Sequence, residues 1–207
     1  MIPRYSLPAI AGLFSDEARF SVWLEVEILA VEAWSALGVV PPEAARAIRE
    51  RAGFTVAEVD EREKVTDHDV AAFVDVVQAH VGGPEGTWVH YGLTSSDVVD
   101  TALAVTVTRA LDLIVESVEA LEAAVAARAR EFRSTPMVGR THGIHAEPTT
   151  FGAKIALWAL QLRRELRRLR AAREVIAVGK LSGAVGTYSN VDPAVEAYVF
   201  ERPGLRP

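Results

Sequence analysis

Two long helical patterns constrain the fold of this chain more than any other feature of its sequence. From Val98 to about Phe132, apolar residues recur at spacings of three and four without a Gly or Pro, which predicts a helix roughly three times the average length. A second long helix is predicted from about Thr150 to Val178. The remaining chain is too small to cover both apolar stripes. We therefore expect a helical bundle that other subunits or further chain complete.

Shorter helices are predicted before these two. Ser15 precedes two acidic residues, which is typical of a capped helix start, and Gly38 ends that helix. Two further short helices are expected over residues 43–51 and 56–64. The sequence thus predicts an all-α protein that begins with a small helical cluster.

We expect two domains, an N-terminal helical domain over residues 1–93 and a partial bundle domain over 94–207. Half of the 207 residues are hydrophobic, enough for a sizeable core. There is no cysteine, which excludes disulfides and thiolate metal sites. Pro3 and Pro8 interrupt the N-terminus, so no signal peptide is expected. No run is long enough to span a membrane, and a cytoplasmic protein is predicted.

The stretch between the two long helices, Val138–Gly152, is unusually rich in polar residues. Gly139, Gly143 and Pro148 interrupt any helical pattern there, so we expect irregular backbone that holds reactive side chains. A plain corner between two helices would use the same Gly and Pro residues, and it stays an open alternative. The candidate reactive residues are Arg140, Thr141, His142, His145 and Glu147.

His68 is a second candidate for proton transfer. The run Thr66–Asp69 is typical of a helix start, which places His68 in the first turn. The positive end of the helix dipole there disfavours a protonated imidazole, so a neutral His68 could accept or relay a proton near pH 7. An incidental first-turn histidine is the alternative.

The hydroxyls of Thr94–Asp97 precede the first long helix. Free N–H groups and O–H donors at a helix N-terminus suit a carboxylate or a phosphate, although ordinary capping explains the same residues. From Arg128 to Lys180, basic residues outnumber acidic ones, which favours an anionic ligand near this half. Six arginines between residues 163 and 173 are interpreted as a solvated or interfacial face rather than a nucleic-acid site.

Several blocks of the sequence, in order and spacing, resemble the adenylosuccinate lyases of the fumarase/aspartase superfamily across essentially the whole chain. The blocks are R-Y at Arg4–Tyr5, W-L-E-V-E-I-L-A from Trp23, H-D-V-A-A-F from His68, W-V-H-Y-G-L-T-S-S-D-V-V-D-T-A from Trp88, G-R-T-H-G-I-H-A-E-P-T-T-F-G from Gly139 and S-G-A-V-G-T-Y from Ser182.

The resemblance implies a C–N lyase of purine biosynthesis. Such an enzyme eliminates fumarate from N6-(1,2-dicarboxyethyl)-AMP, giving AMP, and from the succinylated aminoimidazole carboxamide ribotide. A base removes a proton beside a carboxylate, negative charge accumulates there, and an acid protonates the departing nitrogen. The resemblance implies no metal or cofactor, a homotetramer whose active sites combine three subunits, and neither nucleic acid nor membrane as a partner.

Site residues follow from the resemblance by position. His142 corresponds to the general acid for the leaving nitrogen, and His68 to a substrate-contacting histidine that shares the proton traffic. The implied substrate-binding residues are Arg4 and Tyr5 for the phosphate, Asp69 beside His68, and Thr94, Ser95 and Thr141 for the succinyl portion.

Two departures limit the resemblance. Asp67 replaces the Arg or Asn that often precedes the His-Asp pair, and the Ser-rich loop ending in Met-Pro-x-Lys, which supplies the base in the family, has no counterpart here. With the remaining bundle helices and the C-terminal domain also absent, we expect this polypeptide alone to have little or no lyase activity. The alternatives are another lyase of the superfamily, such as argininosuccinate lyase or aspartase, and a non-enzymatic helical protein that acts only through association.

Overall fold

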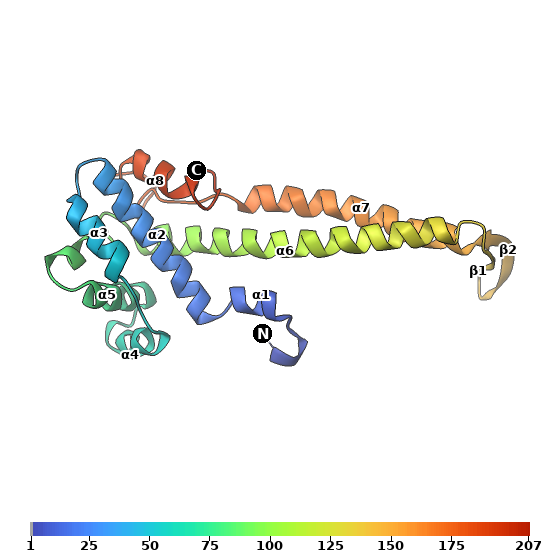
Figure 1. Cartoon of the computed structure of the whole chain (residues 1–207), viewed down its shortest axis with the longest axis horizontal. Coiled ribbons are helices and arrows are strands. Elements are labelled where there is room, and N and C mark those ends of the chain that lie inside the picture. Colours follow the sequence, from blue (N-terminus) through green and yellow to red (C-terminus); the bar gives the residue numbers. More distant parts are fainter. Residues whose placement is uncertain (1) are drawn as a thin grey trace. The chain divides into compact units, whose positions relative to one another are not determined.

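A computed structural model describes residues 2–207, and the fold is mostly helical, as predicted (Figure 1). The chain forms two compact units. The first contains the chain up to Arg109 together with Ile176–Pro207, and the second contains Ala110–Val175. Each unit is described by itself. Among the described residues, no helix is long and apolar enough to cross a membrane.

The first unit is built around α2 (Asp16–Ala36). The Oγ of Ser15 accepts a hydrogen bond from the Ala18 N–H at 3.2 Å, so the predicted cap is confirmed. An aromatic cluster joins α2 to its neighbours: the ring of Phe20 lies 5.6 Å from that of Phe73. Such ring pairs add to the stabilisation from burial alone.

Two of the other helices in this unit, α3 and α4, agree closely with the predicted ranges 43–51 and 56–64. Thr55 and Glu58 form a reciprocal capping box before α4, and the Oδ1 of Asp192 caps α8 by accepting from the Ala194 N–H at 2.8 Å, which fixes both helix starts. The elements are η1 (Pro3–Tyr5), α1 (Pro8–Leu13), α3 (Pro42–Arg51), α4 (Val56–Thr66), α5 (Asp69–Val81), η2 (Pro84–Trp88) and α8 (Pro193–Glu201).

The predicted helix start at Thr66–Asp69 is wrong in detail. The α4 helix continues through Thr66, and Asp67 then reverses the chain with a left-handed φ of 49°, a conformation that Asp tolerates better than most residues. His68 is therefore the N-cap of α5 rather than a residue of its first turn.

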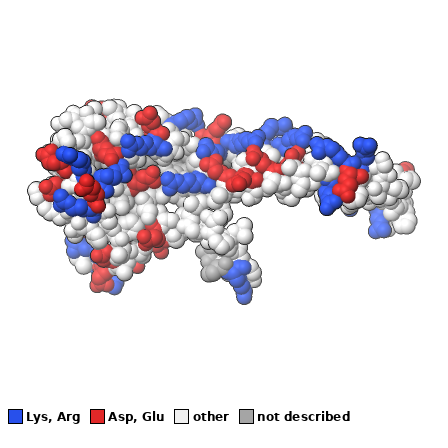
Figure 2. All heavy atoms as spheres, viewed as in Figure 1, with Lys and Arg blue, Asp and Glu red and all other residues white. Residues whose placement is uncertain are grey.

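The second unit contains most of two long helices. The first, α6 (Ser95–Glu131), begins in the first unit, and the second, α7 (Phe151–Ile176), ends there. Both were predicted from the apolar periodicity. Figure 2 shows basic and acidic side chains interleaved along them, consistent with ion pairs of Arg163 with Glu122 at 2.7 Å and of Arg173 with Asp112 at 2.5 Å. Three arginines of α7, Arg163, Arg170 and Arg173, thus pair with carboxylates of α6.

A β-hairpin replaces the irregular loop that was predicted between these helices. Strands β1 (Pro136–Thr141) and β2 (Ile144–Thr150) pair antiparallel, with Thr141 opposite Ile144. The connecting residues His142 and Gly143 have positive φ angles of 54° and 75°, as a two-residue type I′ turn requires. The sequence analysis interpreted Gly143 only as a helix breaker. In the structure it is the second residue of the hairpin turn.

The division into domains at residues 93 and 94 stays a prediction. Packing groups the start of α6 and residues 176–207 with the N-terminal helices. The reason is visible in the core, where Val98 and Ala102 of α6 are buried together with α2 and with Val195 of α8.

Candidate functional site

The starts of two helices meet at His68 and Ser95. His68 Nε2 lies 3.2 Å from Ser95 Oγ, and His68 Nδ1 accepts a hydrogen bond from the Ala71 N–H at 3.4 Å. With Nδ1 accepting, a neutral ring carries its proton on Nε2 and donates it to the serine hydroxyl. Nδ1 also lies 3.4 Å from the Asp69 carboxylate, which would accept a hydrogen bond from a protonated ring. The imidazole therefore has a partner in either protonation state.

The hydroxyls of Thr94 and Ser95 stand at the N-terminus of α6 on half-buried residues. The backbone is held there by a reciprocal pair of bonds: Thr94 N–H donates to Asp97 Oδ2 at 2.9 Å, and Asp97 N–H donates to the Thr94 carbonyl at 2.9 Å. These two bonds hold the turn in place. Fixed donors at a helix N-terminus suit an anionic group.

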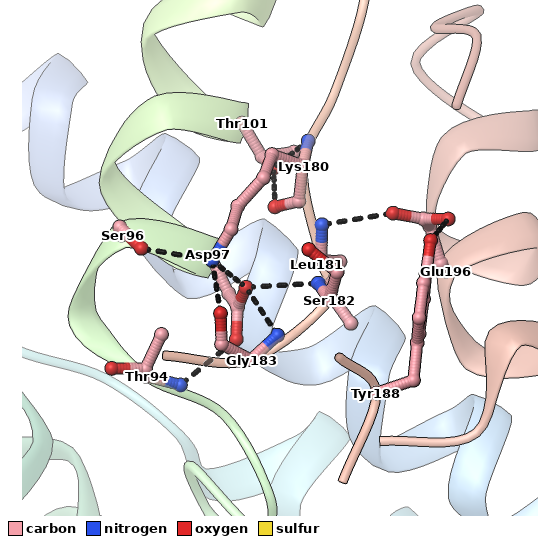
Figure 3. Close-up of polar contacts among 10 residues, drawn as sticks. All are labelled: Thr94, Ser96, Asp97, Thr101, Lys180, Leu181, Ser182, Gly183, Tyr188 and Glu196. Carbon is pink, nitrogen blue, oxygen red and sulfur yellow. Dashed lines mark hydrogen bonds and ion pairs between the residues drawn. The ribbon is translucent and has the colours of Figure 1, made fainter. Parts of the chain in front are cut away.

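Asp97 connects this turn to the segment after α7. Its carboxylate is fully buried and accepts hydrogen bonds from Lys180 Nζ at 2.7 Å and from the Ser182 and Gly183 N–H groups at 3.1 Å each. Figure 3 shows these bonds converging on Asp97 from the ribbon opposite α6. The glycine-containing segment and the Thr94–Asp97 turn are consequently tied into one rigid surface.

A second histidine of the first unit is held by a buried carboxylate. Glu27 is fully buried, and its two oxygens lie 2.9 Å from the His90 backbone nitrogen and 2.6 Å from His90 Nδ1. Burial lowers the pKa of the His90 imidazole, but the hydrogen bond and charge of Glu27, helped by the charge of Asp97, outweigh it and raise the pKa overall. His90 keeps a left-handed φ of 67°, a strained conformation that these contacts stabilise.

His142 occupies the tip of the hairpin in the second unit and is exposed to solvent. Its Nδ1 lies 2.8 Å from the Thr141 hydroxyl, which leaves Nε2 available to a ligand. An open cavity of about 620 Å³ adjoins the hairpin and is lined in part by Arg140, Lys154 and Leu157. The His142 imidazole is therefore accessible to a ligand, as proton transfer to a substrate requires.

Comparisons with known proteins decide the family. A model of the family described as Lyase matches residues 4–204. The chain belongs to this lyase family.

Two curated relatives show which lyases the chain is similar to. It is 52% identical to an adenylosuccinate lyase of Bacillus subtilis (strain 168) over 100% of this chain and 48% of the relative. It is 50% identical to an adenylosuccinate lyase of Staphylococcus saprophyticus over 99% of this chain and 47% of the relative. The lyase chain thus spans about half the length of the curated relatives it matches.

Solved structures confirm the fold. A fumarate lyase from Mesorhizobium sp. BNC1 superposes with a TM-score of 0.88 at 30% identity, covering 95% of this chain and 48% of that one. A 3-carboxy-cis,cis-muconate lactonizing enzyme from Pseudomonas putida gives a TM-score of 0.88 at 29% identity, covering 98% and 48%. The prediction of a fumarase/aspartase-type helical fold is confirmed.

The structure brings only some of the site residues predicted for this lyase together. His68, Asp69 and Ser95 are joined by the contacts described above, and Thr94 precedes Ser95. Asp69 also lines a cavity of about 210 Å³ that includes Arg19 and Trp23. The remaining predicted residues lie elsewhere: Arg4 and Tyr5 are exposed on η1 with the guanidinium 4.8 Å from the ring centroid, and Thr141 and His142 belong to the second unit.

The prediction missed the Glu27–His90 pair. A signal was present, because Glu27 lies four residues after Trp23 on the apolar face of a strongly hydrophobic helix. A carboxylate on such a face is rarely buried without a partner. Among the described residues, no group of three His, Cys, Asp or Glu side chains is placed to hold a metal ion.

Proposed function

We propose that this chain forms part of an adenylosuccinate lyase, which eliminates fumarate from N6-(1,2-dicarboxyethyl)-AMP to give AMP and from the succinylated aminoimidazole carboxamide ribotide. The observation that carries the proposal is the contact between His68 Nε2 and Ser95 Oγ. It places a proton-transferring ring beside hydroxyl and N–H donors, in a chain that is 52% identical to an adenylosuccinate lyase.

The proposed roles divide the chemistry of the elimination. Thr94, Ser95 and Thr141 bind the succinyl portion, where negative charge develops as the proton beside the carboxylate is removed. His142 protonates the departing nitrogen from the exposed hairpin tip, and His68 shares the proton traffic through its bond to Ser95. Arg4 and Tyr5 bind the phosphate, for which their exposure on η1 is suitable, and Asp69 supports His68.

The base that removes the carbon-bound proton is proposed to lie outside this sequence, because the resemblance places it on a Ser-rich loop that these residues do not include. The substrate is a purine nucleotide, and the active assembly is a homotetramer whose sites combine several subunits. Exposed apolar side chains on α6 and α7 support association: Leu121 is 51% exposed, Leu157 66% and Trp158 52%. Such residues on long helices call for partner helices.

Ligand titration on the chain itself tests the substrate class. N6-(1,2-dicarboxyethyl)-AMP is expected to move the NMR resonances of His68 and Ser95 at concentrations where argininosuccinate does not. His68→Ala should weaken this binding. His80→Ala is the matched control, because His80 bonds to the exposed carboxylate of Glu58 at 3.1 Å, away from the Ser95 hydroxyl. Equal binding of both ligands would favour another lyase of the superfamily. Binding of neither, in a sample that forms oligomers, would favour a protein that acts only through association.

A further inference from the structure

The ammonium group of Lys180 makes a complete set of hydrogen bonds at the start of α6. Its Nζ donates to Ser96 Oγ at 2.9 Å, to Asp97 Oδ1 at 2.7 Å and to the Gly183 carbonyl at 2.6 Å (Figure 3). An ammonium group has three N–H donors, so every donor of Lys180 is used. Its orientation, and that of the groups it holds, is therefore fixed.

The same cluster holds the backbone on both sides of Ser95. Thr94 N–H donates to Asp97 Oδ2 at 2.9 Å, and the Ser96 hydroxyl accepts from Lys180. Ser95 lies between these two anchored neighbours, and its own hydroxyl is 3.2 Å from His68 Nε2. A displacement of Ser96 or Asp97 would consequently be transmitted to the Ser95 hydroxyl through one or two peptide units.

Helix stability alone does not account for a lysine at this place. The N-terminus of a helix carries the positive end of its dipole, where a cation is unfavourable. The backbone N–H groups of Thr94, Ser182 and Gly183 already give the buried Asp97 carboxylate three hydrogen bonds. These backbone groups cannot replace the positive charge of Lys180 beside the buried carboxylate, nor its link to the Ser96 side chain.

We propose that Lys180 is a positioning residue, which sets the direction of the Ser95 hydroxyl through Ser96 and Asp97 and thereby fixes the His68–Ser95 pair. The catalytic meaning of that pair rests on the function proposed above. The geometric effect of Lys180 on the pair does not depend on that function and is measurable in the absence of turnover.

The experiment compares Lys180→Met with Lys180→Arg and with the control Lys64→Met. Lys64 is exposed and pairs with Glu61 at 2.5 Å on its own helix, so its loss should not affect the site. In Lys180→Met we expect the Cε1–H and Cδ2–H resonances of His68 to shift, and amide exchange at Thr94 to accelerate about tenfold, the effect of losing one charged hydrogen bond. Lys180→Arg keeps the charge beside Asp97 and should restore part of the Thr94 protection.

Unchanged His68 resonances and Thr94 exchange in a folded Lys180→Met variant would overturn the proposal. Ser96→Ala is a second test if Lys180→Met does not fold. It removes only the hydrogen bond between Lys180 and the Ser96 hydroxyl and leaves the Asp97 carboxylate paired with Lys180. Ser96→Ala should move the His68 resonances in the same direction by a smaller amount, and a spectrum identical to that of Lys64→Met would equally overturn the proposal. Since none of these measurements uses substrate, their failure is distinct from a failure of the ligand titration.

Discussion

At the scale of single residues, the molecule places a buried carboxylate where a histidine can neutralise it. Glu27 is 0% exposed, and both of its oxygens face His90, one the backbone nitrogen and one Nδ1. Removing the His90 ring would leave the buried carboxylate with only the backbone N–H of residue 90, and removing Glu27 would leave the partly buried ring without its partner. Either loss is more costly than losing an exposed ion pair. The fold of the first unit therefore depends on this pair more than on its surface salt bridges.

The raised pKa of His90 makes this contribution depend on pH. Glu27 raises the pKa of His90 above its ordinary value, so the charged pair stabilises the fold fully below the unfolded pKa, about 6.5, and the contribution is lost as pH rises through the folded pKa. Glu27→Gln should lower the free energy of unfolding by roughly 1.5–3 kcal/mol near pH 6, the usual value of a hydrogen bond to a charged group, and by less near pH 9. Urea unfolding across this range measures the difference, with His80→Gln as the control on an exposed pair. A gap that widens towards pH 9 would contradict the argument.

The histidine at the hairpin tip supports a separate prediction. In an assembled lyase that contains this chain, His142→Ala should reduce turnover about 10²–10⁴-fold, the usual value of a general acid. Fumarate release, followed by ultraviolet absorbance, measures the rate. His145→Ala is the matched control, because His145 lies on β2 opposite Arg140, outside the turn. Equal losses in both variants would show that the hairpin as a whole, rather than the imidazole of His142, is needed.

At the scale of elements, the hairpin depends on a close backbone approach as well as on its turn. The strand register shifts between Val138 and Arg140, and a Cβ atom on the intervening Gly139 would collide with the backbone carbonyl of Glu147. A backbone atom cannot move aside as a flexible side chain can. The positions of the polar residues on the hairpin therefore depend on Gly139, although Gly139 has no side chain that could bind a ligand or transfer a proton.

Gly139→Ala tests this dependence. The added methyl group should distort the pairing around the register shift and destabilise the hairpin by about 1–3 kcal/mol, the usual cost of forcing extra volume into a packed site. NMR cross-strand contacts between Arg140 and His145 would weaken in proportion. Gly12→Ala is the control, because its added Cβ meets no atom within 4 Å, and it should be neutral or slightly stabilising. Intact cross-strand contacts in Gly139→Ala would count against this account.

At the scale of the whole molecule, the second unit has more apolar surface than its own helices cover. Arginines of α7 form ion pairs with carboxylates of α6. On the same helix, α7, the apolar side chains of Leu157, Trp158 and Leu160 are half or more exposed. Sixty-six residues arranged as two helices and a hairpin offer no further element to bury them. Association with further helices would bury this apolar surface.

Self-association should therefore depend on this surface. Sedimentation equilibrium of the chain is expected to show oligomers that Trp158→Glu shifts towards the monomer, because a charge would be buried without a partner. Arg164→Glu changes charge on the same helix without removing apolar area and serves as the control. A chain that stays monomeric at all concentrations would indicate that its partner is further polypeptide rather than a second copy.

The sequence by itself determined the longer helices, although not every helix end, because apolar periodicity and capping act over a few neighbouring residues. The Ser15 cap and the two long helices were predicted for this reason. It did not determine contacts between distant segments. Glu27 meets His90 across 63 positions and Lys180 meets Asp97 across 83, and only the packing of α2, α5, α6 and the segment after α7 brings such groups together. The hairpin lies between these two classes. Its strands pair within one short stretch, from Thr141 opposite Ile144 to Pro136 opposite Thr150, but the same glycines suit a hairpin turn and an irregular loop, so only the strand pairing distinguishes the two.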